Sequence, residues 1–234
     1  MFVCFDPGIR NVGFCWGSLG SIDSGNVSLR SIDGIECVDM TIMTHKRVSA
    51  EDCCLSHGPH IQERVAHFLQ EWGYIIHEAS IVLVELQPFQ SAGKPFEILL
   101  KERYGSKVVL IPPRSIHKAL GMGGYTYEGR KKMSVTIASD FLESLVAKEV
   151  KGAPEALKAI DPMDRKHDCA DAVLLLIYYI YHYSPVKKKR KPRETSIAKR
   201  SKYFICKEDV AKDQETLSNF SSFLEQFKYC KGES

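Results

Sequence analysis

Four acidic residues stand where a carboxylate could hold a metal ion: Asp6, Glu85, Asp168 and Asp171. Asp6 ends the apolar run over residues 2–5 and is followed by Pro-Gly, which stops a strand. Glu85 follows a second apolar run, Ile-Val-Leu-Val. A carboxylate at a strand end is held rigidly and still reaches solvent, as a metal ligand must. Asp6 could also nucleate the turn, which Asp often does before Pro-Gly. Whether it is a metal ligand therefore has to be judged together with the other acids.

Asp168 and Asp171 lie three residues apart in a helix expected over residues 165–183, so both lie on one face. A carboxylate on the apolar side of a helix is unfavourable unless it is paired or bound to a cation. Four converging carboxylates favour a hard cation, Mg²⁺ or Mn²⁺. Two ions about 3.5–4 Å apart suit the in-line attack of water on a phosphodiester. The alternative is that Asp168 caps the helix and Asp171 pairs with a nearby Arg or Lys.

The elements that must position these acids form an α/β pattern, in the order β-β-β-α-β-α-β-α-α when the short helix over 114–120 is left out. We expect a mixed central sheet flanked by helices. Strands are expected over residues 2–5, 12–16, 35–43, 81–84 and 108–111, and helices over 57–78, 94–104, 114–120, 130–150 and 165–183. Residues 18–34, rich in Gly, Ser and Asp, are expected to form a loop or wide turn.

The 234 residues suffice for one good core plus an appendage, which we divide into a catalytic domain over 1–184, a basic linker over 185–202 and an amphipathic helical tail over 203–234. The linker holds nine Lys/Arg and a single acid, Glu194, and without it the net charge changes from +3 to −5. Residues 187–193 could serve as a nuclear-import signal or as a flexible phosphate-binding arm. The positive charge is thus concentrated in one segment.

The eight cysteines show no disulfide-scaffold spacing, and no apolar run reaches the length of a membrane span. We expect reduced thiols in an intracellular protein that is not secreted and has no membrane partner. Cys53, Cys54, His57 and His60 could bind zinc, but their spacing departs from the usual paired pattern, so we expect no zinc site there.

Four groups of residues resemble motifs of the RuvC-like Holliday junction resolvases. Asp-Pro-Gly-Ile-Arg-Asn-Val-Gly over residues 6–13 is similar to the first motif, and Val-Glu-Leu-Gln-Pro over 84–88 to the second. Arg-Lys-Lys over 130–132 and Lys-His-Asp-Cys-Ala-Asp-Ala over 166–172 resemble the third and fourth. The likeness spans residues 1–183 and is to the viral branch, the resolvases of poxviruses and other large DNA viruses.

The resemblance implies an RNase H-like fold and a homodimer that nicks four-way DNA junctions symmetrically, leaving 5′-phosphate and 3′-hydroxyl ends. It implies two Mg²⁺ or Mn²⁺ ions per site, held by the four acids, and no small-molecule cofactor. Lys131 and Lys132 would lie near the scissile phosphate, and we choose Lys132 as the catalytic one. Viral relatives often carry Arg after the second acid, where this chain has Leu86. A viral origin would place the protein in a cytoplasmic viral factory or in the nucleus of the host.

A junction offers dense phosphates and little sequence information, so cations should supply most of the affinity. The expected DNA-binding residues are Arg10, Lys94, Arg114, Lys118, Arg130, Lys131 and Lys132. Tyr125 and Tyr127, in a glycine-rich stretch, could stack on opened bases or anchor the loop. Two other functions remain open: another RNase H-like nuclease that cuts RNA–DNA hybrids or single strands, and a non-catalytic protein that binds branched DNA.

Overall fold

A five-stranded mixed sheet forms the centre of the protein, as the sequence predicts. The computed structural model describes residues 1–8, 10–23, 26–42, 53, 55, 58, 60–91, 93–160 and 165–182. The strands are β1 (Phe2–Pro7), β2 (Asn11–Asp23), β3 (Asn26–Asp39), β4 (Ile81–Glu85) and β5 (Val108–Ile111), in the spatial order β3-β2-β1-β4-β5. β1 pairs antiparallel with β2 and parallel with β4, so it is the central strand of the sheet. The α/β, RNase H-like fold class is therefore confirmed.

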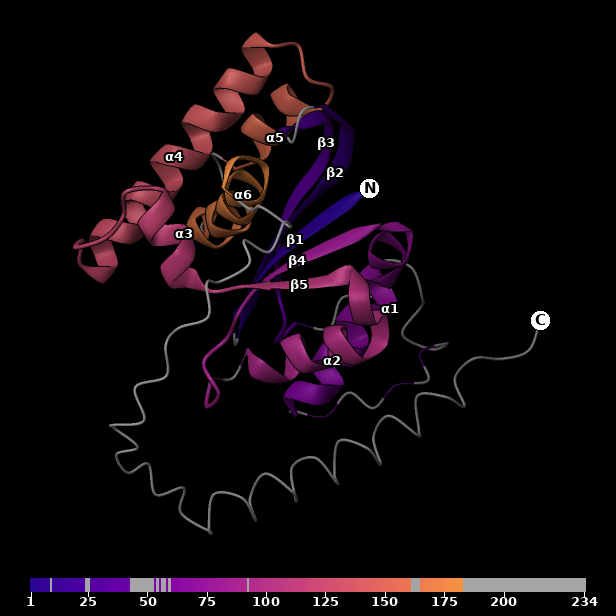
Figure 1. Ribbon diagram of the computed structural model, residues 1–234. Helices are drawn as coiled ribbons and strands as arrows, with labels where there is room; N and C mark the ends of the chain where they lie inside the picture. The colour runs from indigo at the N-terminus through magenta and orange to yellow at the C-terminus, as the bar shows by residue number, and fades with distance from the viewer. Residues whose placement is uncertain are drawn as a thin grey trace, which may run out of the picture. The chain divides into compact units, whose positions relative to one another are not determined.

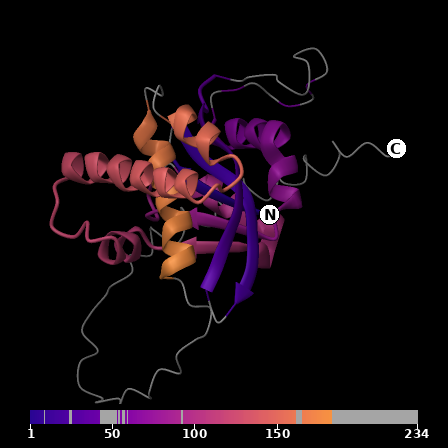
Figure 2. The same ribbon diagram turned by 90° about the horizontal axis from the view of Figure 1, so that it is seen from above.

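Helices cover both faces of this sheet (Figure 1). They are α1 (Ile61–Glu78), α2 (Lys94–Tyr104), α3 (Pro113–Ala119), α4 (Tyr127–Ala147), α5 (Ala153–Ile160) and α6 (Lys166–Tyr181), with a short 3₁₀ turn over Gly105–Lys107. Figure 2 shows α4 and α6 on one side of the strands and α1 on the opposite side. α6 packs directly on β1, β2 and β3, and α4 packs on α6.

Two expectations about the secondary structure are wrong. The loop expected over residues 18–34 is the far half of a long β2–β3 hairpin, in which Leu19 pairs with Leu29 and both pack against the core. Its Gly, Ser and Asp content conceals these apolar positions from a pattern search. α5 was not expected; it begins with Ala-Pro and buries Ala156 and Ile160 beneath β3. The linker over 185–202 and the tail over 203–234 lie outside the described residues, so the domain division stays a prediction.

The face of the sheet beneath α1 and α2 is lined with aromatic side chains. Phe5 and Phe14 project from neighbouring strands with ring centroids 5.5 Å apart. Phe68 of α1 and Phe96 of α2 pack against these strand rings. The centroids of Phe14 and Phe68 are 5.6 Å apart, and those of Phe5 and Phe96 are 5.5 Å apart. All four rings are buried, so this face contributes a large share of the apolar area removed from water.

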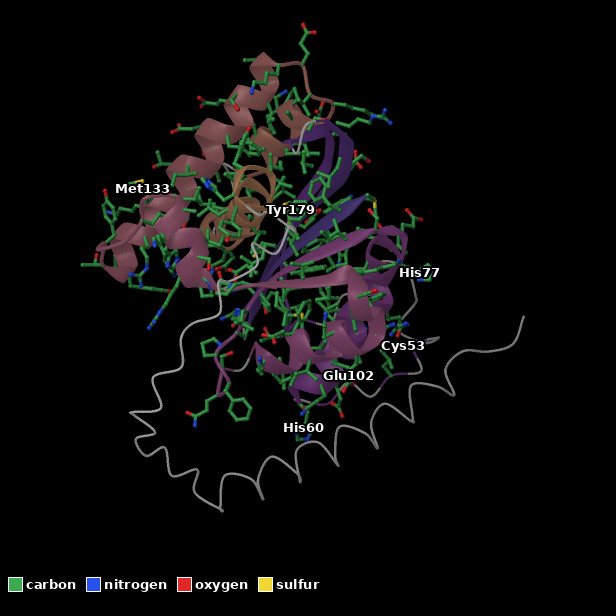
Figure 3. The ribbon with its side chains drawn as sticks, viewed as in Figure 1. Cys53, His60, His77, Glu102, Met133 and Tyr179 are labelled. Atoms are coloured by element: carbon green, nitrogen blue, oxygen red, sulfur yellow. The ribbon has the colours of Figure 1, made fainter. Side chains whose placement is uncertain are left out.

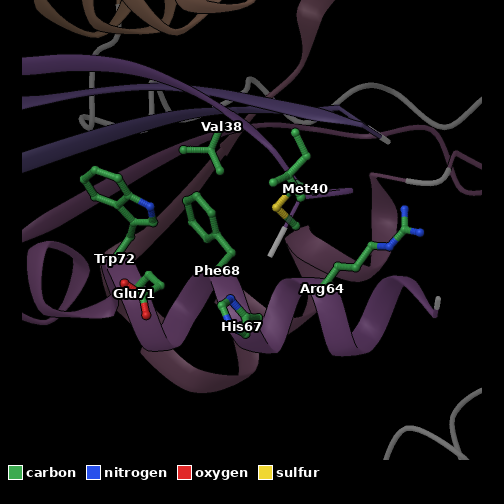
Figure 4. Close-up of a pocket in the computed structure, with 8 residues that line it drawn as sticks. Val38, Met40, Arg64, His67, Phe68, Glu71 and Trp72 are labelled. Atoms are coloured by element: carbon green, nitrogen blue, oxygen red, sulfur yellow. The ribbon is translucent and has the colours of Figure 1, made fainter. Parts of the chain in front are cut away.

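A small pocket between β3 and α1 contains two buried polar side chains of α1, His67 and Glu71 (Figure 4). Val38, Phe68 and Trp72 complete most of its wall, and its volume is about 10 Å³. That volume is close to the space for one water molecule, so the pocket is too small for a substrate. In the part of the chain that the structure describes, no helix has the length and apolar character needed to cross a membrane.

Candidate active site

The two strand-end acids lie side by side on the face of the sheet that α6 covers. β1 and β4 are parallel, and Phe5 pairs with Val84, so Asp6 and Glu85 follow in register. Side chains alternate along a strand, and residues two positions earlier, Cys4 and Leu83, belong to the core cluster that α6 completes. Asp6 and Glu85 therefore point to the same side as the helix that carries the other two acids.

α6 brings Asp168 and Asp171 to that face because its first turn touches the backbone of β2. A Cβ atom at Gly13 would lie 2.1 Å from the carbonyl oxygen of Asp168, which only glycine avoids. Gly13 is itself the partner of Asp6 in the β1–β2 pairing. One turn further along, the Cys15 thiol lies 3.7 Å from the carbonyl oxygen of Ala172. Small residues on both elements thus fix the distance between the helix and the strand acids.

The four carboxylates act on one another. Burial, followed by the charges of Glu85, Asp171 and Asp168, holds the pKa of Asp6 well above its usual range. Burial and the charge of Asp171 raise the pKa of Glu85 to about 7. Burial and the charge of Asp168 raise the pKa of Asp171 to about 6, although two polar neighbours oppose this. The sequence prediction that these acids meet at one place is thus supported by their mutual influence.

The two neighbours that lower the pKa of Asp171 are Ser134, through a hydrogen bond, and Lys131, through its charge. Both come from α4 and lie three residues apart, so they share the face of α4 that packs against α6. Ser134 is buried, and its hydroxyl also lies 3.0 Å from the carbonyl oxygen of Arg130. Sequence reasoning missed Ser134, because only the packing of α4 on α6 brings it to an acid.

Asp168 is held by the residue that caps its own helix. The Nε of Arg165 donates to Oδ2 of Asp168 over 3.0 Å. His167 Nε2 lies 3.2 Å from the other oxygen and 3.0 Å from Nζ of Lys131. Burial lowers the pKa of His167, so the neutral imidazole accepts a hydrogen bond from Lys131, and its contact with Asp168 is not an ion pair. Arg165 and His167 were not among the predicted site residues.

The donor set fits a hard divalent cation. Four carboxylates from β1, β4 and α6 converge, and burial and repulsion disfavour their charged forms, a penalty that a bound cation relieves. Among the described residues, no three Asp, Glu, His or Cys side chains are arranged closely enough to hold an ion as they stand. Asp6, Glu85, Asp168 and Asp171 therefore remain predicted ligands.

Lys131 and Lys132 differ in position. Lys131 is partly buried, and its Nζ lies 4.6 Å from the ring centre of Tyr127 besides contacting His167. Lys132 is exposed on α4, and its carbonyl oxygen accepts a hydrogen bond from Thr136. The structure thus places Lys131 beside the acids, while the catalytic role predicted for Lys132 stays a prediction.

The other predicted DNA-binding residues fall into two groups. Arg10 is exposed and pairs with Asp39 over 2.9 Å, and Lys94 is largely buried in an ion pair of 2.6 Å with Glu97. The charge of Lys94 is therefore already balanced within the protein. The second group has no ion pair with an acid among the residues that the structure describes: Arg114, Lys118 and Arg130 line one hollow between α3 and α4.

Two aromatic side chains beside the cations of α4, and one on the loop after β4, are exposed. Tyr125 and Tyr127 are 45% and 60% exposed, and Tyr125 lies in the loop before α4 while Tyr127 begins that helix. Phe89, 69% exposed on the loop after β4, was not among the predicted residues. An apolar ring in the polar stretch Gln-Pro-Phe-Gln was the signal that could have found it.

Of the residues considered for zinc, Cys53 and His60 are on the α1 side of the sheet (Figure 3). Cys54 and His57 lie outside the described residues. The Cys53 thiol contacts Gln70 in the middle of α1, whereas His60 immediately precedes α1. Ten residues of helix span on the order of 15 Å, so Cys53 and His60 stand at different places along α1.

Comparison with known proteins gives structural matches only. No protein-family model and no curated protein matches the sequence. The fowlpox virus Holliday junction resolvase matches with 16% identity and a TM-score of 0.50, covering 76% of this chain and 97% of that one. The same fowlpox resolvase with substrate Holliday junction DNA matches with 19% identity over 77% and 98%, at a TM-score of 0.46. RuvC of Thermus thermophilus matches with 16% identity over 76% and 93%, at a TM-score of 0.42.

At these low sequence identities, the matches show a similarity of fold. The likeness to the fowlpox enzyme covers nearly all of that protein and about three quarters of this chain. The resemblance stated from the sequence motifs is confirmed as a likeness of fold. This chain has the fold of a RuvC-like, viral Holliday junction resolvase.

Proposed function

We propose that this chain is a structure-selective endonuclease that hydrolyses phosphodiester bonds in four-way DNA junctions. The observation that carries the proposal is the meeting of four carboxylates, on a resolvase fold, with a lysine of α4 beside them. Cations that line a hollow on the same helix supply a second feature expected of a protein that binds dense phosphates. The resolvase fold supports this reading, and the role of each residue is part of the proposal.

The carboxylates of Asp6, Glu85, Asp168 and Asp171 would hold two Mg²⁺ or Mn²⁺ ions, which supply an activated water and stabilise the leaving oxygen. The oxygen of water would bond to phosphorus and lose a proton, and the bond from phosphorus to the 3′ oxygen would break. The 3′ oxygen would take up a proton, which leaves a 5′-phosphate and a 3′-hydroxyl. The ammonium of Lys131 lies where it can balance the negative charge that grows on the phosphoryl oxygens.

The surrounding residues keep the acids in place for this reaction. Arg165 restrains Asp168 through one oxygen, and Ser134 restrains Asp171. His167 accepts a hydrogen bond from Lys131 and so fixes the direction of its ammonium group. Because one site cuts one strand, paired nicks need two copies, so we further propose a homodimer that acts on viral or nuclear DNA.

The test is cleavage of a labelled synthetic four-way junction in Mg²⁺, in Mn²⁺ and in EDTA, with linear duplex and an RNA–DNA hybrid alongside. Wild type is expected to cut the junction with paired, symmetric nicks that a DNA ligase can reseal. EDTA and Asp168→Asn are expected to abolish cutting. The matched control is Asp140→Asn, an exposed acid on α4, which should cut normally.

Each other outcome favours one of the open alternatives. Cutting of the hybrid while the junction is spared would make the protein another RNase H-like nuclease. Binding of the junction without cutting under any metal condition would indicate a non-catalytic protein that binds branched DNA. Retained cutting by Asp168→Asn, with its fold verified by circular dichroism, would show that the acids do not form the site.

A further inference from the structure

A basic hollow of about 450 Å³ opens between α3, the loop after it and the first turn of α4. Figure 1 shows α3 beside the start of α4. Arg114, His117 and Lys118 line the hollow from α3, and Arg130 lines it from α4. Among the described residues that line it, none is acidic. The hollow therefore concentrates three permanent positive charges without a carboxylate to balance them.

The local structure fixes these charges in place. Arg114 and Lys118 are four residues apart on α3, so their side chains lie on one face, an unfavourable arrangement for like charges unless an anion joins them. The guanidinium of Arg130 donates over 2.7 Å to the carbonyl oxygen of Tyr125, so it is held at the rim. That bond uses one of five N–H groups and leaves the others for a ligand.

The loop that closes the hollow leaves it empty of side chains. Gly121 and Gly124 have φ angles of 69° and 90°, which favour glycine, and a Cβ at either position would meet no atom within 4 Å. Burial, together with the charge of Arg130, lowers the pKa of His117, so the imidazole is a neutral hydrogen-bonding group there. The hollow has the size, polarity and charge suited to a phosphate group.

The hollow adjoins the acids through α4. Consecutive residues of a helix point about 100° apart. Arg130 faces the hollow, whereas Lys131, the next residue, faces Asp171 and His167. The hollow and the acids are therefore contacted by consecutive residues of one turn of α4.

We propose that the basic hollow binds one backbone phosphate of the strand whose scissile phosphate lies at the four acids. Arg114 and Lys118 neutralise this second phosphate, and Arg130 anchors it from the rim. The contact fixes which phosphodiester reaches the acids, so it sets the position of the cut. This inference rests on the proposed function, because it assigns the hollow to the same substrate.

Binding is measured by fluorescence anisotropy in EDTA, where no cleavage is expected, with the full-length chain. The variant is Arg114→Ala with Lys118→Ala, and the matched control is Lys148→Ala with Lys158→Ala, two exposed cations outside the hollow. The hollow variant is expected to bind a junction roughly tenfold to a hundredfold more weakly, with a salt dependence shallower by about one in log–log slope. The control is expected to stay close to wild type.

A second series locates the phosphate. Single phosphates on either side of the cut are replaced one at a time by a neutral methylphosphonate. At one position wild type should lose about tenfold in affinity while the hollow variant loses no more, because its contact is already gone. In Mg²⁺, the hollow variant should distribute its cuts over neighbouring phosphodiesters instead of one.

The failures are distinguishable. Equal affinity of the hollow variant and wild type would overturn the hollow as a binding site. Equal sensitivity of both proteins to every methylphosphonate would show that it holds no particular phosphate, and an effect confined to arms with a 5′-terminal phosphate would assign it to strand ends. If wild type binds through the hollow but cuts no junction, the phosphate site stands and the proposed nuclease function fails.

Discussion

The two faces of the sheet are built in opposite ways. Beneath α1 and α2, large rings such as Phe14, Phe68 and Trp72 fill the space, and edges of rings meet faces of others. Beneath α6, the contact at Gly13 brings backbone against backbone, and large aliphatic side chains, such as those of Leu83, Val173 and Leu176, pack around it. One face is packed mainly through aromatic rings, and the other combines an aliphatic core with one close backbone contact.

This difference separates stability from positioning. An aromatic layer can lose one ring and repack, at a loss of stability spread over many neighbours. The backbone contact between Gly13 and α6 cannot repack in this way. A side-chain atom added at Gly13 would displace α6, and with it Asp168 and Asp171. The acids thus lie on the face whose geometry is the less adjustable, which is what a preorganised site needs.

The largest expected effect comes from a charge on the α6 face. Lys131→Ala should lower the rate of junction cleavage by about 10²–10³-fold, a loss typical of removing one group that stabilises transition-state charge. Single-turnover cleavage with saturating protein measures this. Lys132→Ala, the exposed neighbour on the same helix, should cut close to the wild-type rate. Loss of cleavage with Lys132→Ala but not with Lys131→Ala would support the catalytic role that the sequence analysis predicted for Lys132.

Replacing one glycine on each face by alanine compares the two faces directly. Gly13→Ala should lower the free energy of unfolding by about 1–3 kcal/mol and reduce cleavage, because the new methyl group meets the backbone of α6. Gly73→Ala, within α1, meets only the Tyr104 hydroxyl at 3.5 Å and should raise stability by about 0.5–1 kcal/mol. Urea unfolding measures both. Similar destabilisation by the two substitutions would remove the distinction between the faces.

The acids should also make the protein less stable as pH rises when no divalent ion is present. The folded-state pKa of Glu85, about 7, and that of Asp171, about 6, exceed the ordinary values of 4.5 and 3.8, so the folded state holds more protons between these limits. The free energy of unfolding therefore falls from about pH 4 to 7, by roughly 1.4 kcal/mol for each unit by which a pKa differs.

Urea unfolding in EDTA across this range measures the slope. Glu85→Gln should make it flatter, whereas Glu102→Gln, an exposed acid on α2, should leave it unchanged. A free energy of unfolding that rises with pH in the metal-free protein would contradict the buried, mutually repelling arrangement of the acids.

The smallest expected effect lies on the aromatic face. Phe68→Leu keeps most of the buried area but removes three ring contacts, with Phe5, Phe14 and Phe96. We expect a loss of about 1–2 kcal/mol in the free energy of unfolding and an unchanged cleavage rate per folded molecule. A fall in cleavage as large as that of Gly13→Ala would show that both faces position the acids.

The sequence predicted the fold and the strand-end positions of Asp6 and Glu85 because both depend on local pattern. Apolar runs announce the strands, and Asp6 and Glu85 follow such runs directly. The β2–β3 hairpin was missed beyond residue 17 because its strands carry Gly, Ser and Asp. The pairing of these strands is part of the tertiary structure, which the composition of the segment does not reveal. Composition describes a segment's average, whereas a strand depends on a few alternating positions.

The residues that surround the acids depend on which face of each helix packs against its neighbours, and a short sequence pattern does not show this. Lys131 and Lys132 are equivalent in sequence, and the way α4 packs on α6 decides which of them faces Asp171. Ser134 reaches Asp171 only through that packing. Lys94 and Arg165 are different, because each has an acidic partner three residues away, Glu97 and Asp168, which could have been seen in the sequence.

The edges of the sheet bear on how two copies can meet. One outer strand, β5, has four residues; the other, β3, has three register irregularities against β2, and Ser31 bridges to Lys151. Short, bulged or covered outer strands are the means by which proteins block edge-to-edge pairing. A second copy would therefore find no long straight edge to extend, and a dimer of this chain is expected to form through helices, with its sheets kept separate.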